Sequence, residues 1–172
     1  MSDNLSPAPL KNILLAMIYE LLLICAVSFV GLLCATPFVF IFKNIPLLSS
    51  TCVSLCVLAA WYLYLIGTWK KGQTLPMKSW SLVIKTANGN RPTIKHLRLR
   101  FLWAVLFFIL IPSVAYLATR HLGYPPKIAA GLSLIWWILP IGWLFVGGNR
   151  QTLYDFLSGT KLFKKVASWI LL

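Results

Sequence analysis

Four long apolar runs constrain what this chain can fold into. They cover residues 13–42, 47–69, 101–119 and 128–145, and only the first contains a charged side chain. A helix needs about 20 mostly apolar residues to cross the hydrocarbon core of a bilayer. The sequence therefore predicts an all-α integral membrane protein with four transmembrane helices.

The composition agrees with a membrane protein of one domain, residues 1–172. Hydrophobic residues make up 59% and charged residues 11% of the chain, whereas a soluble domain is about 45–50% apolar and about 25% charged. The net charge of +13 would also suit a nucleic-acid binder. Because the basic residues gather where the apolar runs end, we expect the lipid bilayer and anionic lipid headgroups as partners, and no nucleic acid.

The first apolar run is too long for one span. Its 30 residues would make a helix of about 45 Å, against a core of about 30 Å. Pro37 can end a helix, and Pro112 and Pro140 can kink one. No internal repeat is evident, which argues against an inverted-repeat transporter. The expected spans are 13–36, 47–69, 101–119 and 128–145.

The stretch Lys70–Arg100 sets the expected orientation. It lies between the second and third runs and carries eight basic and no acidic side chains. Basic segments that flank spans are retained in the cytoplasm. Both termini then lie in the cytoplasm as well, with thirteen basic residues on that side and three on the other.

Two segments outside the spans have a pattern of their own. Residues 161–172 are amphipathic at helical spacing, which predicts a helix lying in the membrane surface. Residues 80–86 have modest strand character and precede the turn signal Asn88-Gly89.

Glu20 is the one charged side chain inside the expected spans. It lies about seven residues, or about 10 Å, into the first helix. An isolated carboxylate in hydrocarbon costs several kcal/mol, so Glu20 is expected to be protonated or paired. Arg98 and Arg100 enter the membrane at the same level, and a pair with one of them is expected. Glu20 is then either a structural ion pair or a carboxylate that binds a proton or cation.

Asp155 stands in the string Thr152-Leu-Tyr-Asp155. This is the spacing of a capping box, with Asp in place of the usual Glu. Asp155 is therefore expected to cap a short helix. A role of Asp155 in an ion or ion-pair site is the alternative.

A polar turn follows the second span. Lys70 and Lys71 are expected to reach the headgroups, and Gln73 and Thr74 either bind a headgroup phosphate with them or form a simple interfacial turn.

Other site chemistry finds little support. The four cysteines form no CxxC and the two histidines are isolated, so no metal site is expected. The sequence holds only three acidic residues. We therefore expect no catalytic residues, no cofactor and no enzyme activity.

Two strings carry a family resemblance. The first signature string is Gly72-Gln-Thr-Leu-Pro-Met-Lys-Ser-Trp80, and the second is Arg150-Gln-Thr-Leu-Tyr-Asp-Phe-Leu-Ser-Gly-Thr160. Together they resemble the RDD family of small, mostly bacterial integral membrane proteins, over residues 10–160. The resemblance implies a location in the bacterial cytoplasmic (inner) membrane.

The family is named for one arginine and two aspartates. By resemblance, Glu20 stands for the first aspartate and Asp155 for the second, while Lys11 or Asn12 stands near the place of the early arginine. Pro76 replaces a small glycine. Lysine and glutamate keep the charges but not the bidentate geometry of an Arg–Asp pair.

Two functions follow as expectations. Transport, including cation/proton exchange, has been proposed for family members, which implies a small transporter or transporter subunit that forms homo-oligomers. The alternative is a non-catalytic scaffold or assembly factor that binds headgroups or a membrane-protein partner.

Overall fold

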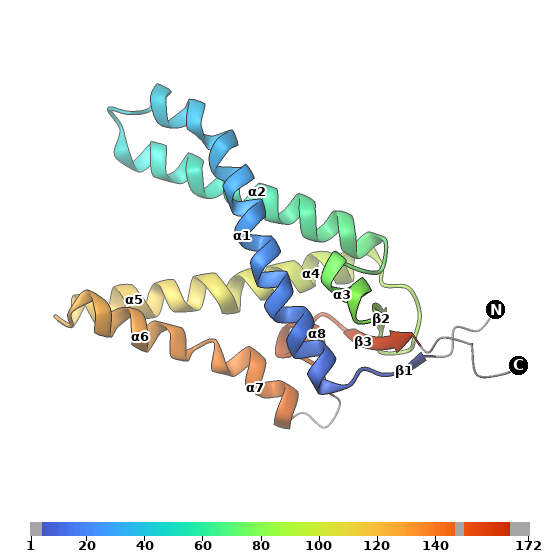
Figure 1. Cartoon of the computed structure of the whole chain (residues 1–172). Helices are drawn as coiled ribbons and strands as arrows, with labels where there is room; N and C mark the ends of the chain where they lie inside the picture. The colour runs from blue at the N-terminus through green and yellow to red at the C-terminus, as the bar shows by residue number, and fades with distance from the viewer. Residues whose placement is uncertain (1–4, 147–149, 166–172) are drawn as a thin grey trace, which may run out of the picture.

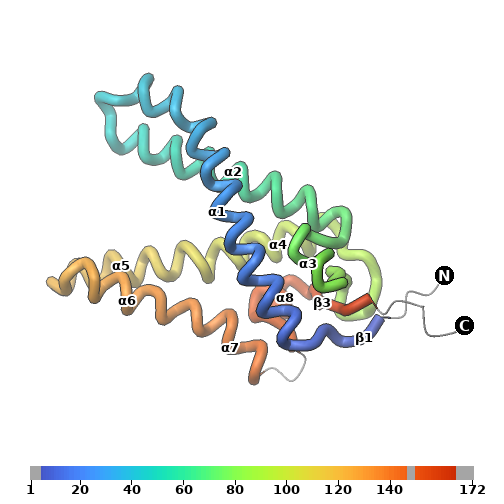
Figure 2. The backbone as a smooth tube through the Cα atoms, viewed as in Figure 1, coloured from blue at the N-terminus to red at the C-terminus, as the bar shows by residue number. Residues whose placement is uncertain are grey.

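Two helical arms diverge from a shared end in the computed structural model, which describes residues 5–146 and 150–165 (Figure 1). The first arm consists of α1 (Leu10–Ile41) and α2 (Pro46–Lys70). The second arm consists of α4 (Ile94–Val105), η1 (Leu106–Leu110), α5 (Ile111–His121), α6 (Pro126–Ile135) and α7 (Ile138–Val146). The tube in Figure 2 shows both arms starting beside the strands and short helices, which we call the sheet end, and separating toward their tips.

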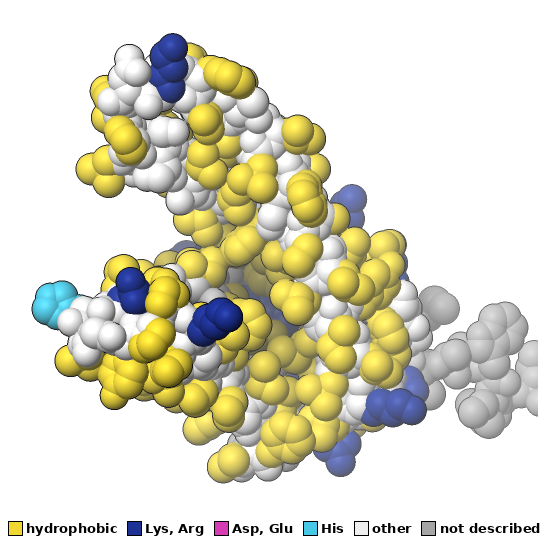
Figure 3. Space-filling view, turned by 60° about the vertical axis from the view of Figure 1, so that its left-hand side comes forward, with side chains coloured by type: hydrophobic (Ala, Val, Ile, Leu, Met, Phe, Trp, Pro, Cys, Tyr) yellow, Lys and Arg dark blue, Asp and Glu magenta, His cyan; other side chains and the backbone are white. Residues whose placement is uncertain are grey.

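The four expected membrane helices are confirmed. Helices long and apolar enough to span a bilayer cover Leu10–Ile41, Pro46–Ser79, Ile94–His121 and Pro126–Val146. In their most apolar stretches no more than 22% of the residues are buried inside the protein. Apolar side chains cover both arms on the face seen in Figure 3, with a hollow between the arms. Their surroundings are therefore lipid rather than protein.

The first span does not end at Pro37. α1 continues through this residue to Ile41, so the predicted boundary at residue 36 is wrong. A proline inside a helix removes one backbone hydrogen bond. Ending the helix in hydrocarbon would leave several backbone groups without partners, which costs more.

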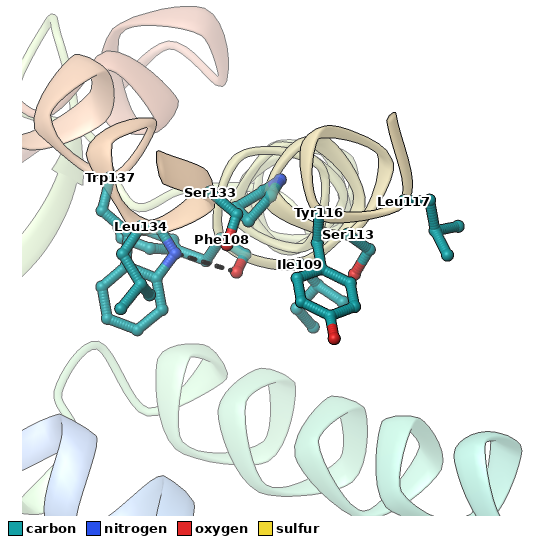
Figure 4. Close-up of a pocket in the computed structure, with 9 residues that line it drawn as sticks. Phe108, Ile109, Ser113, Tyr116, Leu117, Ser133, Leu134 and Trp137 are labelled. Atoms are coloured by element: carbon teal, nitrogen blue, oxygen red, sulfur yellow. Dashed lines mark hydrogen bonds between the residues drawn. The ribbon is translucent and has the colours of Figure 1, made fainter. Parts of the chain in front are cut away.

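The third span absorbs its proline in a π-helical turn. It consists of α4 (Ile94–Val105), the π-helix η1 (Leu106–Leu110) and α5 (Ile111–His121). Pro112 has no N–H for the carbonyl of Phe108, which an α-helix would require. The indole Nε1 of Trp137 donates to that carbonyl instead, at 3.1 Å (Figure 4).

The fourth span is interrupted at Trp136 and Trp137. α6 (Pro126–Ile135) ends just before them and α7 (Ile138–Val146) begins just after them. The expected kink at Pro140 thus appears one turn earlier, because a proline ring clashes with the carbonyl four residues before it, here that of Trp136.

A three-stranded antiparallel sheet accompanies the helices. The strands β1 (Leu5–Pro7), β3 (Thr160–Lys165) and β2 (Leu82–Thr86) lie in that order. The strand expected around residues 80–86 is confirmed.

The amphipathic helix predicted for residues 161–172 is wrong over 161–165, which belong to β3, and the rest lies outside the described residues. A short apolar run fits the period of a helix as well as that of a strand. Here pairing with two strands gives hydrogen-bond partners to the backbone N–H and C=O groups of β3.

The protein core lies at the sheet end. Ile13, Leu82, Ile84 and Leu97 are at most 1% exposed there. They come from α1, β2 and α4, so this cluster joins both arms. Packing between protein side chains is therefore concentrated at the sheet end.

The first arm is held together by small residues and one polar contact. Trp61 Nε1 donates to Ser28 Oγ at 2.8 Å across α1 and α2. At Gly31, an added Cβ would lie 2.9 Å from Cα of Val57. Such close backbone approach is typical of membrane helix pairs with small residues at the contact.

We predict that Gly31→Ala lowers the thermal stability of the detergent-solubilised protein. The added methyl group meets the α2 backbone, and overpacking costs about 1–3 kcal/mol. Gly67→Ala is the matched control, since nothing lies within 4 Å of its Cβ position. It should leave the melting temperature unchanged or raise it slightly. Equal melting temperatures for the two variants would contradict the close contact.

Candidate functional site

The two signature strings form two short capped helices at the sheet end. α3 (Leu75–Ser79) begins after Thr74, and α8 (Leu153–Leu157) begins after Thr152. Each threonine Oγ1 accepts a backbone N–H three residues on, at 3.4 Å in α3 and 3.3 Å in α8. The helix cap expected at Thr152 is therefore confirmed, with Asp155 bonded to the hydroxyl of Thr152.

Each capping threonine also donates its hydroxyl to a carboxylate. Thr74 Oγ1 donates to Oε2 of Glu20 at 2.5 Å, and Thr152 Oγ1 donates to Oδ2 of Asp155 at 2.8 Å. Charge-assisted hydrogen bonds of this kind are short and strong. The two strings thus hold both acidic residues of the described part of the chain.

The polar residues of the first string point inward. Gln73 Nε2 donates to the carbonyl of Leu82 at 2.7 Å, and Thr74 is fully buried. Thr74 is therefore turned away from a headgroup surface, whereas Gln73 is half-buried with its amide nitrogen bonded to the fold, and headgroup binding by Gln73 stays a prediction. Lys70 and Lys71 remain exposed at the end of α2.

Arg100 is buried and forms a salt bridge with Asp155. Its Nε lies 2.8 Å from Oδ1 of Asp155, and each side chain is 2% exposed. The guanidinium carbon lies 4.6 Å from the ring centre of Trp69 and 5.6 Å from that of Tyr154. Aromatic faces at such distances attract a desolvated cation.

The expected pairing of Glu20 with Arg98 or Arg100 is wrong. α8 packs against α4 and brings Asp155 to Arg100, whereas α1 packs against α3 and brings Glu20 to Thr74. Arg98 is exposed, and its Nε donates to Tyr62 Oη at 3.2 Å. Asp155 is thus more than a helix cap.

The surroundings of Asp155 shift the ionisation of two groups. Burial raises the pKa of the Asp155 carboxyl, while the Arg100 charge and the hydroxyl of Thr152 oppose this rise. Burial and the nearby Asp155 charge raise the pKa of Tyr154 to about 12. Tyr154 therefore stays neutral at physiological pH and serves Arg100 as a polarisable ring.

Glu20 has no salt-bridge partner among residues 5–146 and 150–165. Its Oε1 is buried and forms no hydrogen bond of good geometry there, but the buried Oη of Tyr64, which has no other partner among these residues, lies beside the carboxylate. Lys11, which stands near the place of the early arginine, is exposed. In the described structure, Glu20 is the acidic side chain that forms no salt bridge.

A cavity of about 380 Å³ lies on the second arm, and Figure 4 shows several of its side chains pointing toward α2 of the first arm. Its lining is mainly apolar and includes the hydroxyl groups of Ser113, Tyr116 and Ser133. No three His, Cys, Asp or Glu side chains come together in the part of the chain that the structure describes. The charged site at the sheet end and this cavity therefore have different chemistry.

Sequence reasoning missed the aromatic residues around the charged site. Trp69 and Tyr154 flank Arg100, and Tyr64 lies beside Glu20. The sequence did give a signal for these residues, because Trp69 lies just before the first signature string and Tyr154 lies inside the second. Aromatic residues near span ends are common as belts, and this ordinary role hid the specific one.

We predict that Arg100→Gln and Asp155→Asn each destabilise the protein strongly. Removing one member of a buried pair strands the other charge, at about 3–5 kcal/mol. The double variant should lose clearly less than the sum of the two single losses. Arg98→Gln is the control on the same helix, and an exposed side chain should contribute about 0–1 kcal/mol. Thermal unfolding in detergent measures all four, and additive losses would contradict the coupling.

Comparison with known proteins places this geometry in a family. The profile described as the RDD family matches residues 8–159, which include all four membrane helices, the first signature string and the second except for Thr160. No curated protein and no solved structure matches the chain. Because the match covers most of the 172 residues, this multi-pass membrane protein belongs to the RDD family.

Proposed function

We propose that this protein is a small transporter, or a transporter subunit, in which Glu20 binds a proton or another cation during the transport cycle. The sheet end faces the cytoplasm of a bacterium in this proposal, and the protein resides in the inner membrane. Lys70 and Lys71 then lie at the level of anionic headgroups.

The state of Glu20 is the observation that carries the proposal. It lies on a membrane-spanning helix, one oxygen is held by Thr74, and the carboxylate forms no salt bridge with any residue that the structure describes. Acidic side chains in membrane helices mark ion and proton pathways unless a nearby base pairs with them. Arg100 is engaged with Asp155, which leaves Glu20 to be neutralised by an exchangeable cation.

The separated arms support a path for a solute. They join at the sheet end and diverge toward their tips, with a cavity on the face of the second arm that looks toward the first (Figures 1 and 4). Four helices enclose little space by themselves. The proposal therefore includes a homo-oligomer, in which a second copy completes the walls of the path.

Flux measurements with purified protein in liposomes test this proposal. A pH-sensitive dye inside the liposomes reports proton movement after a Na⁺, K⁺ or pH gradient is imposed. Wild-type protein should produce flux above that of empty liposomes, and Glu20→Gln should abolish the excess, because the amide cannot take up a proton or balance a cation. Lys43→Gln, an exposed change at the tip of the first arm, should keep the wild-type rate.

The alternative is a non-catalytic scaffold that binds lipid headgroups or a membrane partner. It is favoured if the folded wild-type protein moves no cation under any imposed gradient. Wild-type flux in Glu20→Gln would contradict the role of Glu20 while leaving transport itself in place.

A further inference from the structure

The two signature strings fold in the same way, position by position. Adding 78 to the number of a residue in the first string gives its counterpart in the second, so that Gln73 corresponds to Gln151. With that shift, the helices α3 and α8 coincide, and so do their capping threonines. Gln73 and Gln151 each donate to the carbonyl nine residues further on, at 2.7 and 3.2 Å.

The backbone turns coincide as well. Positive φ angles occur before each glutamine, at Gly72 (86°) and Arg150 (50°). They occur again before each strand, at Ser81 (54°) and Gly159 (67°). Left-handed residues are rare outside glycine. Two such residues at matched positions in both strings therefore indicate one backbone design used twice.

The strands that follow are paired as a two-fold axis requires. β2 and β3 are antiparallel, and Ile84 pairs with Leu162, its own counterpart at the shift of 78. Ala87 N donates to the carbonyl of Gly159 at 3.2 Å, and Lys165 N donates to that of Ser81 at 2.8 Å. Residues 87 and 165, and residues 81 and 159, are counterparts. A contact and its reciprocal are the mark of two-fold symmetry.

The sequence expectation of no internal repeat is therefore wrong. The strings share little beyond Gln-Thr-Leu, which hides the relation in the sequence. The first half, residues 10–86, runs from α1 to β2, and the second half, residues 94–165, runs from α4 to β3. Each half contains two spans, a short capped helix and a strand, in the same order. Both halves enter the membrane from the sheet end, so the repeat is parallel rather than inverted. Ion and substrate sites of transporters with repeats lie where the repeats meet.

We propose that Glu20 and Asp155 are the matching carboxylates of these two halves, and that Asp155 is a positioning residue that holds Arg100 away from Glu20. In the second half, the Arg100 guanidinium neutralises Asp155 permanently. In the first half, the carboxylate of Glu20 stays available to an exchangeable cation. This inference rests on the proposed function of Glu20 as a cation site.

The capping threonines identify the two carboxylates as counterparts. Thr74 and Thr152 occupy matched positions, and each gives its hydroxyl to one acid. Asp155 comes from the capped helix itself, whereas the matched position in α3 is Met77. In the first half, α1 supplies the acid in its place through Glu20.

Arg100 lies where it can serve either half. One neighbouring ring, Trp69, belongs to the first half, and the other, Tyr154, belongs to the second. Nε of Arg100 lies at ion-pair distance from Asp155 without hydrogen-bond geometry, and its Nη1 is buried with no hydrogen-bond partner among the described residues. Glu20 is faced by Thr74 from the α3 cap, by Tyr64 from α2 and, through space, by the Arg100 charge. Without Asp155, the stranded Arg100 charge would act on Glu20, the other acid of the described residues.

A first experiment tests whether the two halves match. In a Glu20→Gln background, Met77→Asp places a carboxylate at the position equivalent to Asp155, where Thr74 can receive it as Thr152 does. The melting temperature should stay within about 3 °C of the Glu20→Gln parent. Ile66→Asp in the same background is the control, because Ile66 is as buried as Met77 but has no capping threonine. It should lose more than about 10 °C. Equal losses would overturn the equivalence.

A second experiment tests the positioning role without measuring transport. Dicyclohexylcarbodiimide reacts with a protonated carboxyl, which adds across a C=N bond to give an O-acylisourea that rearranges to a stable N-acylurea. Mass spectrometry of folded protein in nanodiscs gives the modified fraction of Glu20. In Asp155→Asn, the released guanidinium stabilises the ionised carboxylate, so labelling should fall about tenfold.

Further variants keep this test decisive. Arg100→Gln/Asp155→Asn, Asp155→Glu and the control Arg98→Gln should all label as the wild type does. If Asp155→Asn does not fold, Asp155→Ser removes the same charge and carries the same expectation. Unchanged Glu20 labelling in a folded charge-removing variant would overturn the positioning role. The expected labelling pattern in a protein that gives no flux would retain this inference and reject the transport function.

Discussion

The buried ion pair between Arg100 and Asp155 holds the two ends of the functional region together. It connects α4, which enters the membrane, to α8, which follows the last membrane helix. It does so beside the apolar core and the paired strands of the sheet end, whereas the arms themselves are largely exposed to lipid. Without a hydrophobic driving force between helices in hydrocarbon, polar contacts and close packing decide which segments associate. A fully buried pair flanked by two aromatic rings meets that need at a single point.

The need to satisfy buried polar groups explains the form of the rest of the sheet end. Gln73 and Gln151 each close a turn by donating to a strand carbonyl, and each capping threonine both accepts a backbone N–H and donates to an acid. β3 pairs with strands on both sides, which leaves few backbone groups without partners. The same requirement explains why Trp137 donates to the carbonyl that Pro112 cannot serve. These contacts fix the short helices in place, so the acids they hold have defined positions.

Much of the membrane architecture could be predicted, because span length and apolar composition are local properties of the sequence. The cap at Thr152 and the strand near Leu82 were likewise readable from neighbouring residues. The features that failed depend on contacts between distant segments. The pairing of residues 161–165 with β2 decides between helix and strand there, and the packing of α8 on α4 decides which acid receives Arg100. The repeat escaped notice because backbone geometry is shared by the two strings while most side chains differ.

Charge balance at the sheet end connects this architecture to function. Two acids and one buried arginine come together there, and the arginine is committed to Asp155. Glu20 is left in surroundings where an uncompensated charge costs several kcal/mol. A stable protein could have avoided that cost with a second arginine in the first half or an apolar residue at position 20. The chain instead retains an acid that Thr74 holds and that no basic side chain of the described residues pairs with. Near-symmetry between the halves makes the difference informative: in the second half a buried arginine neutralises the acid that a capping threonine holds, whereas Glu20, held by Thr74, forms no salt bridge with any described residue.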